Sequence, residues 1–121
     1  MTKLWLDDMR PHPEGWERAK SVKQAIELME KGDVTHASLD HDLGYWSSEG
    51  GNGIKLTDWM AEHDCWPTEG IRVHSSNPSG VQAMLATIDR YGPYGTGIGW
   101  DPQRGTAPNA DGSWPPSDRY M

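Results

Sequence analysis

Two short apolar stretches of this 121-residue chain each end in acidic side chains. Residues 4–6 are followed by Asp7 and Asp8, and residues 38–39 are followed by the run Asp40-His41-Asp42. Such stretches are typical of short strands that deliver polar side chains to the C-terminal edge of an open α/β sheet, where ligands bind. If the two strands are neighbours, the four aspartates gather at one point and repel one another unless a proton or a cation intervenes.

Clustered carboxylate oxygens suit Mg²⁺, Mn²⁺ or Ca²⁺. One acidic strand end alone would favour a terminus that simply faces solvent, but two at matching strand positions favour a metal site. We therefore predict that a divalent cation, Mg²⁺ or Mn²⁺ or alternatively Ca²⁺, is held by Asp7, Asp8, Asp40 and Asp42. Because side chains alternate along a strand, Asp40 is a better ligand candidate than Asp42.

Two histidines, His41 and His74, also fall at predicted strand ends, and each could be either a structural residue or a proton-transfer group. His41 lies between two candidate ligands, so strand alternation is expected to turn its ring away from Asp40. His74 directly precedes Ser75 and the polar residues that follow it. We predict that His74 carries proton transfer and that His41 has a supporting or structural part.

The run Ser75-Ser76-Asn77 is a candidate phosphate-binding segment. Asn77 is a suitable helix cap, and Pro78 after it is favoured at the first helical position. The N–H groups at a helix start attract anions, although the same residues could serve only as a cap. Arg10 in the first loop is the candidate cation for the phosphate, with an exposed surface arginine as the alternative. Trp46 is the candidate for stacking on a nucleobase, with packing in the core as the alternative.

Alternating strands and helices must position these residues, and this alternation indicates a parallel sheet. Strands are predicted at residues 3–6, 16–20, 34–40, 71–75 and 96–100. Helices are predicted between residues 21 and 32, over 54–63, and from 77 to 88. Two prolines and a glycine forbid a regular helix at 10–15, and glycines make 45–53 a loop that could close over the site as a mobile flap.

Size and composition predict one domain, because 121 residues are too few for two ordinary ones. The formal net charge of −7 argues against long nucleic acid as the main partner, while a bound cation could still attract a small phosphorylated ligand. A single cysteine, Cys65, excludes an internal disulfide framework. We find no signal-peptide pattern and no membrane-spanning run, so we expect a cytoplasmic protein without a membrane partner.

Three motifs taken together resemble the cyclic-phosphate processing receiver domain, an offshoot of the response-regulator receiver fold. They are LWLDDMRP at residues 4–11, SLDHDLG at 38–44 and VHSSNPSG at 73–80. The resemblance implies a flavodoxin-like sheet, and we expect an α/β sandwich of three layers with about five parallel strands in the order 2-1-3-4-5. The chain departs from the receiver pattern at residues 10–15, where a proline-rich loop replaces the first helix, so we expect this helix to be degenerate. We expect this domain to cover residues 1–100, followed by an irregular Pro- and Gly-rich tail at 101–121.

The resemblance also implies site residues and a function. The acidic pocket would be Asp7, Asp8 and Asp40, and the additions of the offshoot would be His41, Asp42, His74, Ser75 and Asn77. We expect a metal-dependent phosphoesterase that acts on a small cyclic-phosphate or cyclic nucleotide substrate. The alternatives are a module that sequesters a nucleotide signal without turnover, and a stand-alone receiver phosphorylated on Asp40. The last is disfavoured, because residues 94–100 lack the lysine that receivers place after strand five.

Overall fold

The computed structural model describes residues 2–12, 14–75 and 77–93. In chain order its elements are β1 (Thr2–Leu6), β2 (Glu17–Ala19), α1 (Val22–Glu30), β3 (Val34–Leu39), the 3₁₀ helix η1 (Gly44–Ser48), α2 (Gly53–His63), β4 (Gly70–Val73) and α3 (Pro78–Tyr91). The predicted strand at 96–100, the predicted tail at 101–121 and the candidate residue Ser76 lie outside the described residues.

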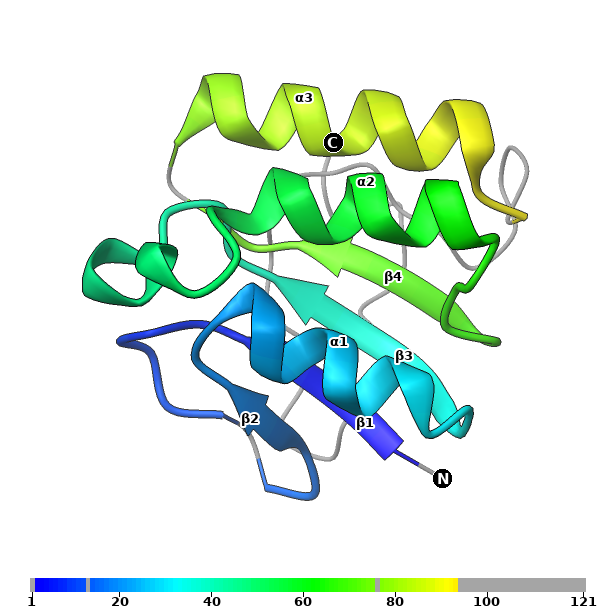
Figure 1. Cartoon of the computed structure of the whole chain (residues 1–121), viewed down its shortest axis with the longest axis horizontal. Coiled ribbons are helices and arrows are strands. Elements are labelled where there is room, and N and C mark those ends of the chain that lie inside the picture. Colours follow the sequence, from blue (N-terminus) through cyan, green and yellow to red (C-terminus); the bar gives the residue numbers. More distant parts are fainter. Residues whose placement is uncertain (1, 13, 76, 94–121) are drawn as a thin grey trace.

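The four strands in the described part of the chain are parallel and lie in the order β2-β1-β3-β4, as predicted for them (Figure 1). Leu6 pairs with Ala19 on one side and with Leu39 on the other, and Leu39 pairs with Val73. The residues that follow these four positions therefore emerge at one edge of the sheet. They are Asp7, Lys20, Asp40 and His74.

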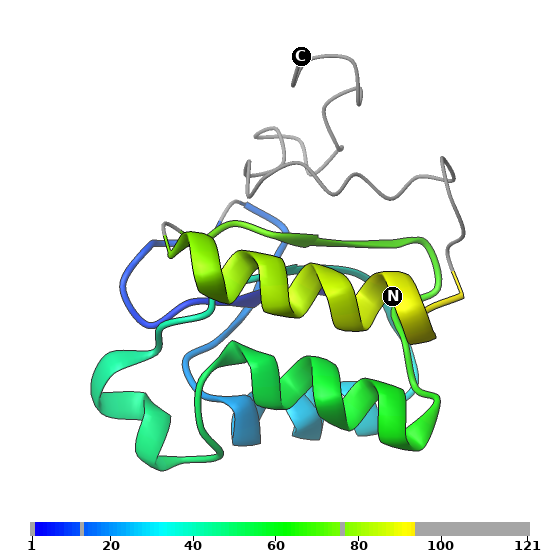
Figure 2. The same cartoon turned by 90° about the horizontal axis from the view of Figure 1, so that it is seen from above.

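The sheet separates an aliphatic face from a more polar one. The aliphatic face carries buried side chains from three strands: Leu4, Leu6, Ala37, Leu39, Ile71 and Val73. Alternation places Trp5, Ser38 and Arg72, which are cross-strand neighbours, on the opposite face. Helices α1 and α2 pack on the aliphatic face, and α3 packs against α2 beside β4 (Figures 1 and 2). Of the predicted three layers, the described residues thus contain the sheet and one helical layer.

The helix starts follow the predicted caps. Ser21 Oγ accepts the N–H of Gln24 at 3.1 Å at the start of α1. Asn77 Oδ1 accepts the N–H of Gly80 at 3.0 Å at the start of α3, which has proline in its first turn. Between β1 and β2 the described residues contain no helix, which agrees with the predicted loss of the first helix.

The segment predicted as a loop at 45–53 is more regular than expected. Its first residues lie in η1, and Glu49, directly after η1, is tied to the start of α1. The N–H of Lys23 donates to the carbonyl of Glu49 at 3.1 Å, and the hydroxyl of Ser21 donates to the carboxylate of Glu49 at 3.2 Å. In this conformation the segment is therefore anchored rather than a free flap.

Candidate functional site

Three of the four predicted aspartate ligands meet at the C-terminal edge of the sheet. Asp7, Asp8 and Asp40 each offer one carboxylate oxygen, and these oxygens all lie within 4.8 Å of one another. The strand ends are held together because the N–H of Asp40 donates to the carbonyl of Leu6 at 2.8 Å. Asp8 lies against Gly44, where an added Cβ would come within 2.8 Å of Asp8 Oδ2. A glycine here therefore leaves room for the carboxylate.

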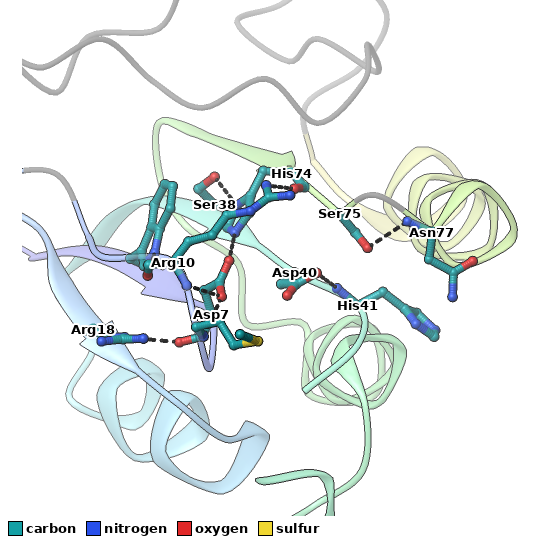
Figure 3. A network of polar contacts seen from close by, with 11 residues as sticks. Asp7, Arg10, Arg18, Ser38, Asp40, His41, His74, Ser75 and Asn77 are labelled. Atoms are coloured by element: carbon teal, nitrogen blue, oxygen red, sulfur yellow. Dashed lines mark hydrogen bonds and ion pairs between the residues drawn. The ribbon is translucent and has the colours of Figure 1, made fainter. Parts of the chain in front are cut away.

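Asp7 is the most constrained of the three carboxylates. Its side chain is only 1% exposed, and Oδ1 accepts the N–H groups of Met9 and Arg10, each at 2.8 Å. Oδ2 accepts a hydrogen bond from His74 Nε2 at 2.8 Å (Figure 3). Burial alone would raise the pKa of Asp7, but these hydrogen bonds hold it below its usual value. Asp7 is thus a fixed, ionised carboxylate.

The pKa of Asp40 is shifted in the opposite direction, above its usual value. Burial and the nearby charge of Asp7 raise its pKa, against the hydrogen bonds from the Ser75 hydroxyl and from the His41 N–H at 2.8 Å. The charge of Asp7 disfavours the charge of Asp40, and carboxylate oxygens gathered in this way fit a hard divalent cation. The residues present therefore suit the cation that the sequence predicted.

Asp42, the fourth predicted ligand, is not part of this cluster among the described residues. Its Oδ1 lies 2.7 Å from His41 Nδ1, and Asn77 Nδ2 donates to its two oxygens at 3.1 and 3.2 Å. The bonds to His41 and Asn77 lower the pKa of Asp42. The His41 ring packs so closely on α3 that a Cβ at Gly80 would lie 2.4 Å from it. Figure 3 shows this ring turned away from Asp7, on the side of Asn77.

His74 is buried, and both of its ring nitrogens have partners. Nε2 bonds to Asp7, and Nδ1 lies 2.7 Å from the hydroxyl of Ser38. The ring also stacks on Trp5, with centroids 4.2 Å apart and planes 11° from parallel. Sequence reasoning did not select Ser38 or Trp5, although strand alternation places both on one face of the sheet, opposite the aliphatic core.

The remaining candidates are divided between the site and the core. Arg10 Nη1 donates to the carbonyl of His74 at 2.7 Å, so this side chain reaches the edge that carries the aspartates (Figure 3). The Ser75 hydroxyl accepts the N–H of Asn77 at 3.1 Å besides contacting Asp40. Trp46 is half-buried against the core, with the ammonium of Lys20 at 5.6 Å from its ring centre. Its neighbour Tyr45 is 82% exposed.

The family model described as the cyclic-phosphate processing receiver domain matches residues 2–90. The chain belongs to this family. The match spans all four described strands and nearly all of α3, and it agrees with the receiver-like strand order of this sheet. Comparisons with curated proteins and with solved structures gave no match. Within residues 2–93, as far as they are described, no helix combines the length and apolar character needed to cross a membrane.

Proposed function

We propose that this cyclic-phosphate processing receiver domain is a metal-dependent phosphoesterase acting on a small cyclic-phosphate or cyclic nucleotide substrate. The observation that carries the proposal is the cluster of Asp7, Asp8 and Asp40, whose oxygens approach within 4.8 Å of one another. A divalent cation held by these carboxylates would polarise a phosphoryl oxygen. Family membership supports the substrate class, because the family is named for cyclic-phosphate processing.

The residues beside the cluster supply contacts for a phosphate. The Ser75 hydroxyl lies between Asp40 and the start of α3, and helix N-termini favour anions. Arg10 adds a positive charge at this edge, where its guanidinium donates one N–H to the carbonyl of His74 among the described residues. These groups would offset the negative charge that the aspartates present to an anionic substrate.

Proton transfer in this proposal belongs to His41 rather than to His74. The bond to Asp42 assigns the proton of the neutral His41 ring to Nδ1 and leaves the Nε2 lone pair as a base. The His41 side chain is 16% exposed, whereas that of His74 is 0% exposed and engaged at both nitrogens. His41 is thus the histidine of the two that keeps a ring nitrogen for proton exchange with a substrate.

The test is cleavage of 3′,5′- and 2′,3′-cyclic mononucleotides by the full chain, with Mg²⁺, with Mn²⁺ and with a chelator. Metal-dependent formation of the linear monophosphate supports the proposal. Tight binding with the cyclic nucleotide recovered intact would indicate sequestration instead. Labelling of Asp40 by acetyl phosphate without cleavage would indicate a phospho-acceptor receiver.

A further inference from the structure

We infer that Ser38 is a positioning residue for the metal site, acting through His74 on the carboxylate of Asp7. The inference rests on the proposed function, because Asp7 is there a ligand of the cation. It adds a buried second layer of residues to the site, running from β3 through the end of β4 to the end of β1.

The His74 ring is held in place by stacking and by hydrogen bonds at both of its nitrogens. It stacks on the Trp5 ring with the centroids 4.2 Å apart, and its side chain is 0% exposed. Trp5 is itself fixed, because its indole N–H donates to the carbonyl of Arg10 at 3.1 Å. Trp5 therefore holds both sources of donors for Asp7. It binds the loop whose two N–H groups reach Asp7, and it stacks on the His74 ring, which supplies the third donor.

The hydrogen bonds assign the proton positions of this chain of groups. Asp7 already accepts two backbone N–H groups at Oδ1, so its Oδ2 accepts the proton on His74 Nε2. In the neutral ring, Nδ1 is then an acceptor, and the Ser38 hydroxyl at 2.7 Å is its donor. Ser38 is fully buried, so water does not replace that donor. The hydroxyl thus selects the ring state that donates to Asp7.

A carboxylate ligand held in this way binds metal more tightly than a free one. Histidines and carboxylates behind a metal ligand fix its orientation, and losing such a partner costs about 10–100-fold in metal affinity. Asp7 Oδ2 has one lone pair committed to His74 and the other available to a cation. Loosening His74 would let the carboxylate rotate and would misdirect that lone pair.

The experiment compares Ser38→Ala and Ser38→Thr with Thr35→Val. Thr35 lies on the same strand, at the end away from Asp40, and its hydroxyl donates to the carbonyl of Thr2 at 3.3 Å. Thr35→Val thus removes a hydroxyl from β3 without touching His74. Mn²⁺ affinity is measured by calorimetry, and urea unfolding confirms that each variant is folded. ¹⁵N NMR of the metal-free wild type reports which nitrogen of His74 carries the proton.

We expect the Nε2–H form of His74 in the wild type. We also expect weaker Mn²⁺ affinity in Ser38→Ala, by up to the about 10–100-fold that the loss of a ligand's direct partner costs. Ser38→Thr, which keeps the hydroxyl, should retain most of the affinity, and Thr35→Val should retain all of it. Wild-type Mn²⁺ affinity in Ser38→Ala would overturn the role of Ser38 but not the metal site. An Nδ1–H form of His74 in the wild type would overturn it as well, and this result does not depend on whether the variants fold. Absence of Mn²⁺ and Mg²⁺ binding by the wild type would overturn the metal site itself.

Discussion

Asp7 and Asp40 are neighbouring carboxylates whose environments shift their pKa values in opposite directions. Three hydrogen bonds compensate the charge of Asp7, whereas burial and Asp7 together disfavour the charge of Asp40. An enzyme that places a poorly compensated charge at its site loses stability there and gains a group ready for a cation. Asp40 is therefore the residue at which stability and the proposed metal binding should conflict.

We predict that Asp40→Asn stabilises the metal-free protein at pH 7 and abolishes the stabilisation by Mg²⁺. Because the native pKa of Asp40 is raised, its ionised form is less favourable in the native protein than in the unfolded chain. The advantage of asparagine should shrink as the pH falls through the native pKa, and vanish below about 4, where both states hold the proton. Urea unfolding across this pH range measures the effect. Asp58→Asn, an exposed change on α2, is the control and should alter neither property.

The two histidines should separate turnover from stability. We predict that His41→Ala lowers turnover by about 10²–10⁴-fold, the range for a lost general acid or base, with little loss of stability. His74→Ala leaves the buried carboxylate of Asp7 without its side-chain donor and should cost at least about 1–3 kcal/mol of unfolding free energy. Steady-state kinetics and urea unfolding are compared, with the exposed His63→Ala as control. Loss of turnover in a stably folded His74→Ala, with His41→Ala fully active, would restore the assignment made from the sequence.

Helix α3 acts at the scale of an element, because its first turn positions the His41–Asp42 pair. Asn77 caps the helix through Oδ1 and holds Asp42 through Nδ2, so one side chain links the helix start to the pair. Gly80 gives the His41 ring its space, since an added Cβ would lie 2.4–2.7 Å from three ring atoms. A shift of α3 would therefore reorient the base.

Gly80→Ala should not give the stabilisation that a glycine-to-alanine change usually brings to a helix interior. Alanine usually stabilises a helix interior by about 0.5–1 kcal/mol relative to glycine, but here the methyl group must displace His41. We predict no gain in the free energy of unfolding and a loss of turnover of about tenfold or more. Ser79→Ala, at the exposed neighbouring position, should leave turnover unchanged. If Gly80→Ala acts through His41, it should add little to His41→Ala in a double-mutant cycle, and full additivity would refute this coupling.

For the whole molecule, the sequence predicted the features that depend on chain order and periodicity. The strand order and the meeting of Asp7, Asp8 and Asp40 follow from parallel strands that end in register. Rotamers and long-range partners could not be predicted, because they depend on how side chains pack. Thus Asp42 turned to Asn77 instead of the cluster, and Ser38 on β3 contacts His74 at the end of the neighbouring strand β4. For Trp46, the structure has the alternative given from the sequence, packing against the core.

Metal binding should also be visible in the stability of the whole fold. The three carboxylates follow β1 and β3, so a bound cation would cross-link the central strands of the described sheet. At a free Mn²⁺ concentration 100 times its Kd, the expected stabilisation is about 2.7 kcal/mol. Hydrogen exchange should slow in Thr2–Leu6 and Val34–Leu39 more than in Val22–Glu30. Because the net charge is −7, cations also screen repulsion across the surface, and NaCl at equal ionic strength controls for this. An equal rise of the melting temperature with NaCl, or in Asp40→Asn, would assign the stabilisation to screening and not to a site.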